Sequence, residues 1–268
     1  MNELKDSSNK AFKTGVTSGI LQVSSFLWLK TVNNYQYRYG TGLVDTFKIL
    51  YGNGGPLRFY RGYIPSVFVA SSCKFGELNA YYYSNKFMFN EIERLGFIST
   101  VSSLVKLSIV PVDTLDVFLQ VEGTKGKNML TNKIKTHGVK VLYYGLSPWI
   151  LNNFIGTFTW FGVHNYLDTK YKSNDLLNFN IKNGLIGLSA SITSDVLTNP
   201  LRILKISKQS NNNNLGYLQT IKHINNKYGF SELFIRGLKT RLLIHGIQNV
   251  CFVILWKNLE KKFNININ

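Results

Sequence analysis

Cysteine and histidine are scarce in this chain, which argues against a metal centre. The 268 residues include 2 cysteines and 4 histidines. Cys73 and Cys251 both fall within apolar stretches, so we expect two small buried side chains rather than metal ligands. No phosphate-binding loop and no nucleophile beside a base is apparent in the sequence. The sequence therefore predicts neither an enzyme nor a cofactor.

Acidic side chains are also few, with 14 Asp and Glu against 31 Lys and Arg, a formal net charge of +17. Such a chain could bind nucleic acid, anionic lipid or anionic solutes. Nucleic-acid binders usually cluster their basic residues, whereas here they lie between apolar stretches such as Ile64–Ala70 and Leu146–Phe154. We therefore expect a membrane and no nucleic acid as partner. The polar first ten residues include Glu3 and Asp6, so a cleavable targeting segment is not expected.

What the chain does contain is an internal repeat. Three similar segments, FYRGYIP, LYYGLSP and FIRGLKTR, recur at intervals of about 90 residues. Their central glycines are Gly62, Gly145 and Gly237. We therefore predict one domain of three repeats, with boundaries near 1–92, 93–175 and 176–268.

Each repeat reads as a long helix, a short amphipathic helix and a second long helix. Long helices are expected at Ala11–Gln36, Tyr63–Phe87, Gly96–Val121, Ser147–Tyr171, Lys182–Gln209 and Leu238–Lys262. Short helices are expected at Val44–Tyr51, Leu130–Thr136 and Tyr217–Lys227. Helices of about 20 residues or more can cross a hydrocarbon core. Lys106, Asp113 and Asp195 interrupt them, and a bundle around a polar cavity would hide such groups. The expected fold is an all-α membrane protein with six transmembrane helices.

A second pattern lies at the ends of the first long helices. Pro111 is followed by Asp113, Asp116 and Gln120, Pro200 by Arg202, Lys205 and Gln209, and Ser25 by Leu27, Lys30 and Asn34. Over essentially its whole length the chain resembles the mitochondrial carrier family, whose odd-numbered helices end in Pro-x-acid-x-x-base-x-x-x-Gln. The resemblance implies a multi-pass protein of the mitochondrial inner membrane with its short helices on the matrix side and a central pathway.

In that family the acid of one repeat pairs with the base of the next, and the three pairs close the matrix side. Here the acid positions hold Leu27, Asp113 and Arg202, and the base positions hold Lys30, Asp116 and Lys205. The resemblance keeps one pair, Asp113 with Lys205. Arg202 would face Lys30 as a like charge. Asp116 loses its partner and could instead bridge to Lys30 or to Arg202.

The cytoplasmic gate of the family uses aromatic-acid-x-x-base on the even helices. The nearest matches are Tyr82 with Lys86, Tyr166 with Lys170, and Trp256 and Lys257 with Glu260, where the charges are reversed. No repeat keeps the acid followed by the base. We therefore do not expect the usual cytoplasmic network of salt bridges.

Substrate contacts in the family lie about seven residues, or two helical turns, past the repeat glycine. These positions hold Val69, Asn152 and its neighbour Asn153, and Ile244 and its neighbour His245, with Lys74 and Glu77 as further candidates. Lys74 and Glu77 could equally form a local pair at i, i+3. Carriers of carboxylates commonly present Arg or Lys at the contact positions. Their absence here suggests a site poor in charge.

The glycine segments keep the lipid-binding element of the family. Tyr60, Arg61 and Gly62 in the first repeat, and Gly145 and Gly237 in the others, would hold cardiolipin at helix N-termini. Cardiolipin is therefore an expected bound lipid. An aromatic group containing Tyr81, Tyr82, Tyr83, Phe87 and Phe89 suggests a membrane-interface belt or, alternatively, a partner contact.

Two functions remain open from the sequence. Loss of gate charges with retention of scaffold and lipid positions favours an accessory or structural subunit of a larger, respiratory-type complex of the inner membrane. The alternative is a solute transporter working by alternating access on a small neutral or weakly anionic metabolite.

Overall fold

The structure is a computed structural model, and it describes residues 2–84, 90–171, 179–210 and 216–248. All described elements are helical. The long helices are α1 (Asn2–Tyr39), α3 (Tyr63–Ser84), α4 (Glu91–Glu122), α6 (Leu146–Lys170) and α7 (Phe179–Ser210), and a further helix occupies 238–248. The helix expected at Leu238–Lys262 is thus described over its first part, and its remainder lies outside the described residues.

Short helices follow the first long helix of each repeat. They are α2 (Leu43–Gly52), α5 (Gly126–His137) and α8 (Tyr217–Tyr228). Beside them lie the 3-10 helices η1 (Pro56–Tyr60), η2 (Gly123–Lys125) and η3 (Val139–Tyr143) and the single-turn helix α9 (Glu232–Ile235). The order expected from the sequence is therefore observed in the described part of each repeat. The boundaries between the repeats stay predictions.

One helix start differs from its expectation for a local reason. We expected α4 to begin near Gly96, but it begins at Glu91. Asn90 Oδ1 accepts a hydrogen bond from the Glu93 amide at 2.9 Å, and Glu93 Oε2 accepts one from the Asn90 amide at 3.0 Å. This reciprocal capping box satisfies helix donors that would otherwise lack partners, and it starts the helix about one turn earlier.

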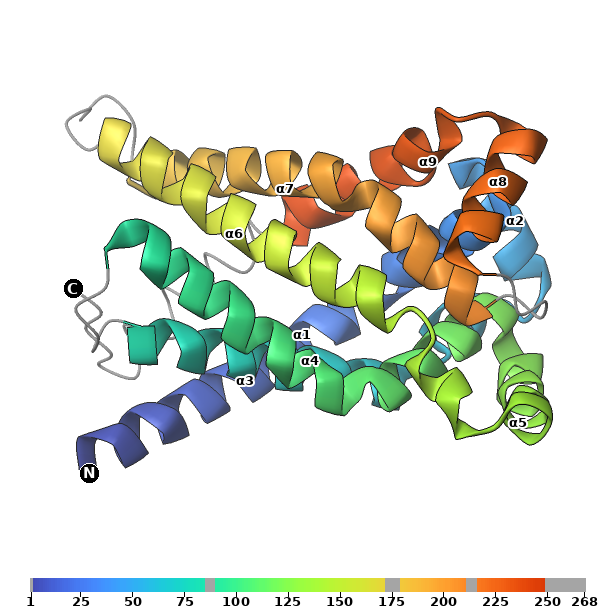
Figure 1. Cartoon of the computed structure of the whole chain (residues 1–268), viewed down its shortest axis with the longest axis horizontal. Helices are drawn as coiled ribbons and strands as arrows, with labels where there is room; N and C mark the ends of the chain where they lie inside the picture. Colours follow the sequence, from blue (N-terminus) through green and yellow to red (C-terminus); the bar gives the residue numbers. More distant parts are fainter. Residues whose placement is uncertain (1, 85–89, 172–178, 211–215, 249–268) are drawn as a thin grey trace.

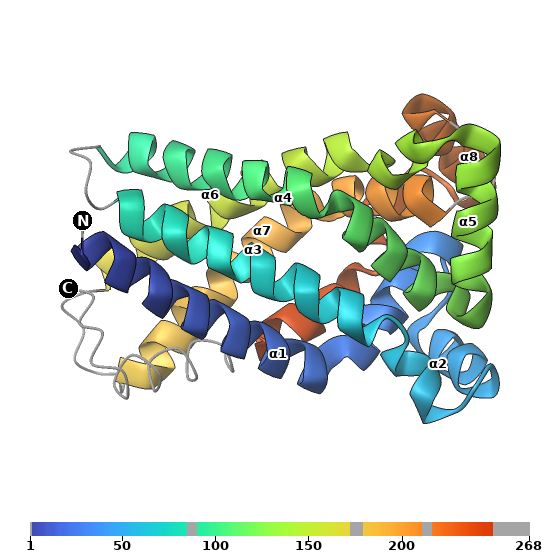
Figure 2. The same ribbon diagram turned by 90° about the horizontal axis from the view of Figure 1, so that it is seen from below.

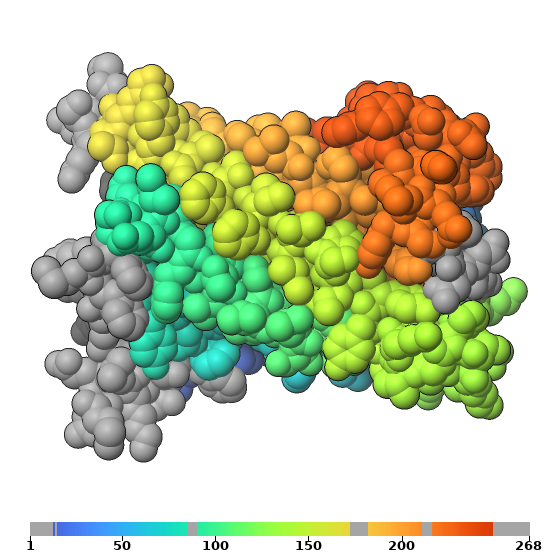
Figure 3. Space-filling model, in the orientation of Figure 1, coloured from blue at the N-terminus to red at the C-terminus, as the bar shows by residue number. Residues whose placement is uncertain are grey.

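The long helices run side by side along the molecule, and α2, α5 and α8 gather at one end, which we call the short-helix end (Figures 1 and 2). Residue 2, where α1 begins, lies at the opposite end. In Figure 1 the long helices draw together toward the short-helix end. Figure 3 shows α4, α6 and α7 forming one continuous outer face. The bundle is thus closed at one end by shorter elements.

Small residues allow α1 and α3 to pack closely. A Cβ atom on Gly15 would lie 3.0 Å from the Phe75 backbone nitrogen, and one on Gly19 would lie 2.8 Å from the Ser71 backbone. The Gly-x-x-x-Gly spacing therefore brings the two helices into backbone contact, as such spacings do in membrane proteins.

The three repeat glycines pack against the next repeat in turn. Gly62, Gly145 and Gly237 have φ of 86°, 80° and 67°. A Cβ atom there would meet Asp116 Oδ1 at 2.8 Å, the Lys205 carbonyl oxygen at 3.0 Å and the Tyr37 ring at 2.8 Å, respectively. Both the left-handed backbone and the space demand glycine. The repeat motif thus fixes the contact of each repeat with the first helix of the following one.

Length and apolar composition make one part of the described chain a candidate membrane span. Within the described residues, one helical stretch, Glu91–His137, has the length and apolar composition needed to cross a bilayer. Other long helices carry polar stripes, and the mean hydropathy of the whole chain is −0.04. Six membrane spans therefore stay a prediction, while the all-helical architecture is established.

Candidate functional site

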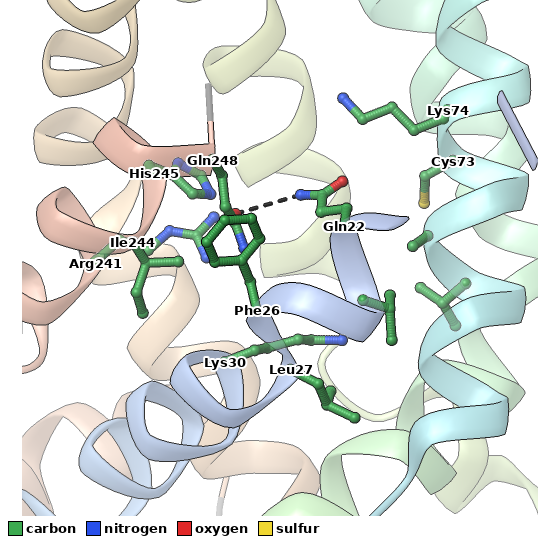
Figure 4. A pocket seen from close by; sticks show the side chains of 13 residues that line it. Gln22, Phe26, Leu27, Lys30, Cys73, Lys74, Arg241, Ile244, His245 and Gln248 are labelled. Atoms are coloured by element: carbon green, nitrogen blue, oxygen red, sulfur yellow. Dashed lines mark hydrogen bonds between the residues drawn. The ribbon is translucent and has the colours of Figure 1, made fainter. Parts of the chain in front are cut away.

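Two connected cavities lie inside the bundle. Their volumes are about 210 Å³ and 440 Å³, and they share five lining residues, Gln22, Lys74, Arg241, His245 and Gln248. Figure 4 shows the smaller cavity, where Gln22 Nε2 donates to Gln248 Oε1 across the space at 3.3 Å. The lining runs from Lys30 at its deep end to Asn165, close to the end of α6. The cavities therefore extend away from the short-helix end.

At the deep end of the cavities, beside Lys30, two ion pairs with buried carboxylates join the repeats. Lys30 Nζ lies 2.7 Å from Asp116 Oδ2, and Lys205 Nζ lies 2.7 Å from Asp113 Oδ2. The side chain of Asp116 is 0% exposed and that of Asp113 is 6% exposed. The Asp113–Lys205 contact has the register that the resemblance implies. Asp116 contacts Lys30, one of the two partners that the sequence left open.

Each ion pair rests on a glutamine from the same helix pattern. Gln120 Nε2 donates to Asp116 Oδ1 at 2.6 Å, and its own Oε1 accepts from Asn34 Nδ2 at 2.5 Å. Gln209 Nε2 donates to Asp113 Oδ2 at 3.0 Å. Buried carboxylates are stable when their remaining oxygen lone pairs are satisfied in this way. The floor of the cavity is therefore a layer of ion pairs supported by hydrogen bonds.

Arg202 does not take part in this layer, contrary to the expected contact with Lys30. Its Nη2 lies 3.0 Å from Asp195 Oδ1, and its Nε donates to Asn152 Oδ1 at 2.9 Å. Asp195 lies about two turns earlier on α7, toward the cavity. The buried carboxylate of Asp195 therefore attracts the Arg202 guanidinium, which avoids the like-charge contact with Lys30.

Asp195 organises a cluster of basic groups. Its side chain is 1% exposed and contacts Arg241 Nε at 3.4 Å and His245 Nδ1 at 2.6 Å, besides Arg202. Arg241 and His245 are one turn apart in the 238–248 helix, so both reach the same carboxylate. One carboxylate thus holds two guanidinium groups and an imidazole at the cavity wall.

On the other side of the cavity a lysine is held by an amide. Lys106 Nζ donates to Asn153 Oδ1, and Asn153 Nδ2 donates to Ser103 Oγ at 3.0 Å. Lys106 is 9% exposed and also lies 5.9 Å from the centre of the Trp149 ring. Its charge is therefore balanced at this contact by dipoles and an aromatic face rather than by a carboxylate.

The substrate-contact candidates come together in the structure. Val69, Lys74, Glu77, Asn152, Asn153, Ile244 and His245 all line one cavity or the other. Lys74 Nζ lies 3.4 Å from Glu77 Oε2, so the local pair exists on the cavity wall itself. What these residues bind is not shown by their position alone.

The family contact positions hold no Arg or Lys, but the larger cavity around them carries several charged side chains. Four cationic side chains line the larger cavity, namely Lys74, Lys106, Arg202 and Arg241. Sequence reasoning missed Arg241 because it took only the family contact positions, and it assigned Arg202 to the gate. A signal was available in Asp195, whose charge inside an apolar helix demands a cationic neighbour.

The cytoplasmic gate candidates are described in part. Tyr166 is 63% exposed, and Lys170 Nζ lies 5.8 Å from the centre of its ring. Tyr82 is half-buried. Lys86, Trp256, Lys257 and Glu260 lie outside the described residues. Of the aromatic group, Phe87 and Phe89 lie outside them too, whereas Tyr81 faces the larger cavity rather than forming part of an outer belt.

The lipid-binding candidates lie at the start of the second long helix of each repeat. Gly145 is the residue immediately before α6, and Gly62 immediately precedes α3. Tyr60 is 38% exposed, and its hydroxyl donates to the Ser24 carbonyl at 3.3 Å, while Arg61 is half-buried. Gly237 precedes the 238–248 helix. Backbone amides at such helix starts can hold phosphate, and cardiolipin binding stays a prediction.

Buried basic groups also connect the short-helix end to the long helices. Lys133 of α5 donates to the Gln209 carbonyl oxygen at 3.1 Å, near the C-terminus of α7. Burial lowers the pKa of Lys133 from 10.5 to about 8, with a smaller contribution from Lys208 and Arg38. Arg58 donates to the Val121 carbonyl at 2.9 Å, and burial lowers its pKa as well. These cations cap helix C-termini, where the dipole favours positive charge.

Comparison with family models finds a similarity over the last third of the chain. Residues 178–266 match the family model described as mitochondrial carrier protein. This segment coincides with the predicted third repeat, including its proline, its Asp195 cluster and its glycine motif. No curated protein matches the chain. Over this third of its length the chain is similar to the mitochondrial carrier family.

Proposed function

We propose that the chain is a carrier of small anionic solutes in the mitochondrial inner membrane. The observation that supports this most is the charge of the cavity wall. Lys74, Lys106, Arg202 and Arg241 line the larger cavity, against the carboxylates of Glu77 and Asp195. The described wall therefore carries more positive than negative charge, which suits carboxylate or phosphate recognition.

The closed layer below the cavity supports a transport cycle. If the short-helix end faces the matrix, as in the family, the two ion pairs close the matrix side while the cavity extends toward the other side. Opening requires that Lys30 and Lys205 part from their aspartates. An anion bound to the cavity cations would change the balance of charge next to these pairs, and only such a differential interaction can shift a conformational equilibrium.

Uptake into liposomes tests the proposal. The full chain is reconstituted with inner-membrane lipids, and uptake of labelled acetate, malonate and phosphate is compared with that of neutral glycerol. We expect saturable uptake of at least one anion, at least tenfold weaker in Arg241→Gln. Lys127→Gln, which removes an exposed lysine of α5, is the matched control and should retain uptake. Uptake equal to that of empty liposomes for every anion would overturn the proposal.

An accessory subunit remains the second candidate function. The specific observation in its favour is the position of the cytoplasmic gate, where Tyr166 and Lys170 lie without an acid at the family position. A carrier-fold protein that cannot close its cytoplasmic side cannot work by alternating access, so a structural role would suit it better. Migration of the native protein only within a larger inner-membrane complex, together with absent uptake, would favour this role. Migration as a free species would count against it.

Cardiolipin completes the proposal as a structural lipid. The glycine segments before α3, α6 and the 238–248 helix supply backbone amides, and Arg61 supplies a nearby charge. Mass spectrometry of the purified protein should find cardiolipin retained through detergent exchange. Arg61→Gln should reduce the retained lipid, since it removes a cation from one of the three positions.

A further inference from the structure

Part of the wall of the larger cavity is aromatic rather than cationic. This aromatic part is lined by Tyr81, Trp160, Phe161 and His164. We call the first three of these residues the aromatic shelf. Basic groups at one depth and aromatic faces at the next are two kinds of recognition element in one cavity, and a simple aliphatic anion would use only the first.

Helical spacing shows that the shelf faces inward. On α6 the cavity is lined by Trp149, Asn152, Asn153, Gly156, Thr157, Trp160, Phe161, His164 and Asn165. These residues recur at three- and four-residue intervals, so they form one stripe of the helix. Phe154 and Phe158 lie off this stripe and are 39% and 36% exposed. Aromatic residues on α6 thus divide into an inward set and an outward set.

Contacts between the rings hold the shelf in place. Tyr81 of α3 and Phe161 of α6 stack with centroids 6.1 Å apart and planes 14° from parallel. Trp160 and Phe161 meet edge to face at 4.8 Å. Trp160 Nε1 donates to Ser191 Oγ at 3.1 Å, which ties the indole to α7. The shelf is therefore built from α3 and α6 and is fixed to α7 by one hydrogen bond, with its rings already oriented.

The spacing between shelf and cations can be read along α7. Ser191 holds the Trp160 indole, and Asp195 holds Arg202 and Arg241. These two α7 residues are separated by four positions, which corresponds to about 6 Å along a helix. The shelf and the Asp195 cluster are thus offset by about one helical turn along the α7 axis, which suits a ring joined to an anionic group by a short linker.

We propose that the transported solute is a small planar aromatic or heteroaromatic acid. Its ring packs against Trp160, Phe161 and Tyr81, and its anionic group is bound by Arg202 and Arg241. Offset and edge-to-face ring contacts favour a flat ring over a saturated one of the same size. The volume of about 440 Å³ is in the range of small-molecule sites. This inference rests on the proposed anion-carrier function and specifies its substrate class.

Binding of matched acids tests the inference. The purified full chain in lipid nanodiscs is titrated calorimetrically with 3-phenylpropionate and with 3-cyclohexylpropionate, which has the same charge and linker but no flat ring. We expect the aromatic acid to bind about tenfold more tightly, a factor equal to about 1.4 kcal/mol. The neutral 3-phenylpropanamide should bind at least tenfold more weakly than the acid, because it lacks the charge for Arg202 and Arg241.

Variants separate the shelf from the cations. Phe161→Leu and Trp160→Leu should each weaken binding of the aromatic acid more than binding of the cyclohexyl acid, and so reduce or remove the preference. Phe158→Leu, which changes an exposed ring of the same helix, is the matched control and should keep the preference. Melting temperatures of all variants verify folding. Because two shelf residues are tested, the loss of one variant to misfolding leaves the other informative.

The possible failures are distinct. Equal binding of the two acids by the unaltered chain would overturn the aromatic-acid inference and leave the anion-carrier function standing. Binding of neither acid would also overturn the inference, and the acetate, malonate and phosphate uptake above would then decide the proposed function by itself. A preference that survives both shelf variants would show that the ring binds elsewhere, and this too would contradict the inference.

Discussion

Lys30 and Asp116, which occupy corresponding base positions in two successive repeats, form a 2.7 Å ion pair in the floor of the cavity. The pair exists because the partner position of Asp116 holds the apolar Leu27, while the partner position of Lys30 holds Arg202, which turns to Asp195. Two departures from the family pattern therefore compensate each other. A charge layer that departs from the family pattern at several positions is thus still paired, with a different partner for Asp116.

Removing one member of this pair should destabilise the protein strongly. In Lys30→Met, Asp116 would remain as a fully buried carboxylate without its cation, and loss of one partner of a buried pair costs about 3–5 kcal/mol. Thermal unfolding in detergent measures the effect as a lowered melting temperature. Lys48→Met removes an exposed lysine of α2 and should change little. A melting temperature equal to that of the unaltered chain would contradict the pairing.

The repeat glycine should matter to the same layer. Gly62→Ala places a methyl group 2.8 Å from Asp116 Oδ1 at a residue with φ of 86°, so both crowding and backbone strain oppose it. We expect a loss of about 1–3 kcal/mol of stability. Gly96→Ala is the matched control. Gly96 lies inside α4, and a Cβ atom there would meet no other atom within 4 Å. This control should be neutral or stabilising. Equal stability of the two variants would refute the argument.

The pKa of Lys133 predicts a rise in stability at alkaline pH. The folded chain releases this proton near pH 8, whereas the unfolded chain holds it to about pH 10.5. Between these values the unfolded state binds more protons, so the contribution of Lys133 to the free energy of unfolding increases with pH. Melting temperatures at pH 7.5 and 9.5 measure the change. Lys133→Met should lose this contribution, and Lys135→Met, an exposed change on the same helix, should retain it. Identical pH profiles for all three chains would rule the assignment out.

Cys73 provides a natural probe of the cavity. Its side chain is half-buried and lines the smaller cavity beside Lys74. In a Cys251→Ser background, a small charged thiol reagent should modify Cys73 slowly, and a bound anion should slow the reaction further. Quantitative mass spectrometry with and without 3-phenylpropionate follows the rate. Modification unaffected by every anion that the protein binds would place the anion site elsewhere.

The comparison of sequence and structure separates what local patterns can predict from what they cannot. Helix order and the repeat follow from apolar spacing and from glycines such as Gly62, whose requirement is local. The Asp113–Lys205 contact follows from a motif with fixed register. Arg202 could not be placed in this way, because its position depends on competition between Asp195 on its own helix and the gate layer below. The direction in which the aromatic side chains point could not be predicted either. Tyr81 suggests a membrane-interface residue from sequence alone, because its stacking partner Phe161 belongs to another helix.

Counter-exchange in liposomes tests the central claim most directly. The claim is that the cavity with its excess of cations belongs to a working anion carrier closed by the Lys30–Asp116 and Asp113–Lys205 pairs. Proteoliposomes are loaded with or without unlabelled 3-phenylpropionate, and the initial uptake of the labelled acid is measured. We predict a several-fold faster uptake into the loaded vesicles, abolished in Arg241→Gln. Saturable binding of the acid without any uptake, loaded or empty, would contradict the carrier function and favour a retained scaffold.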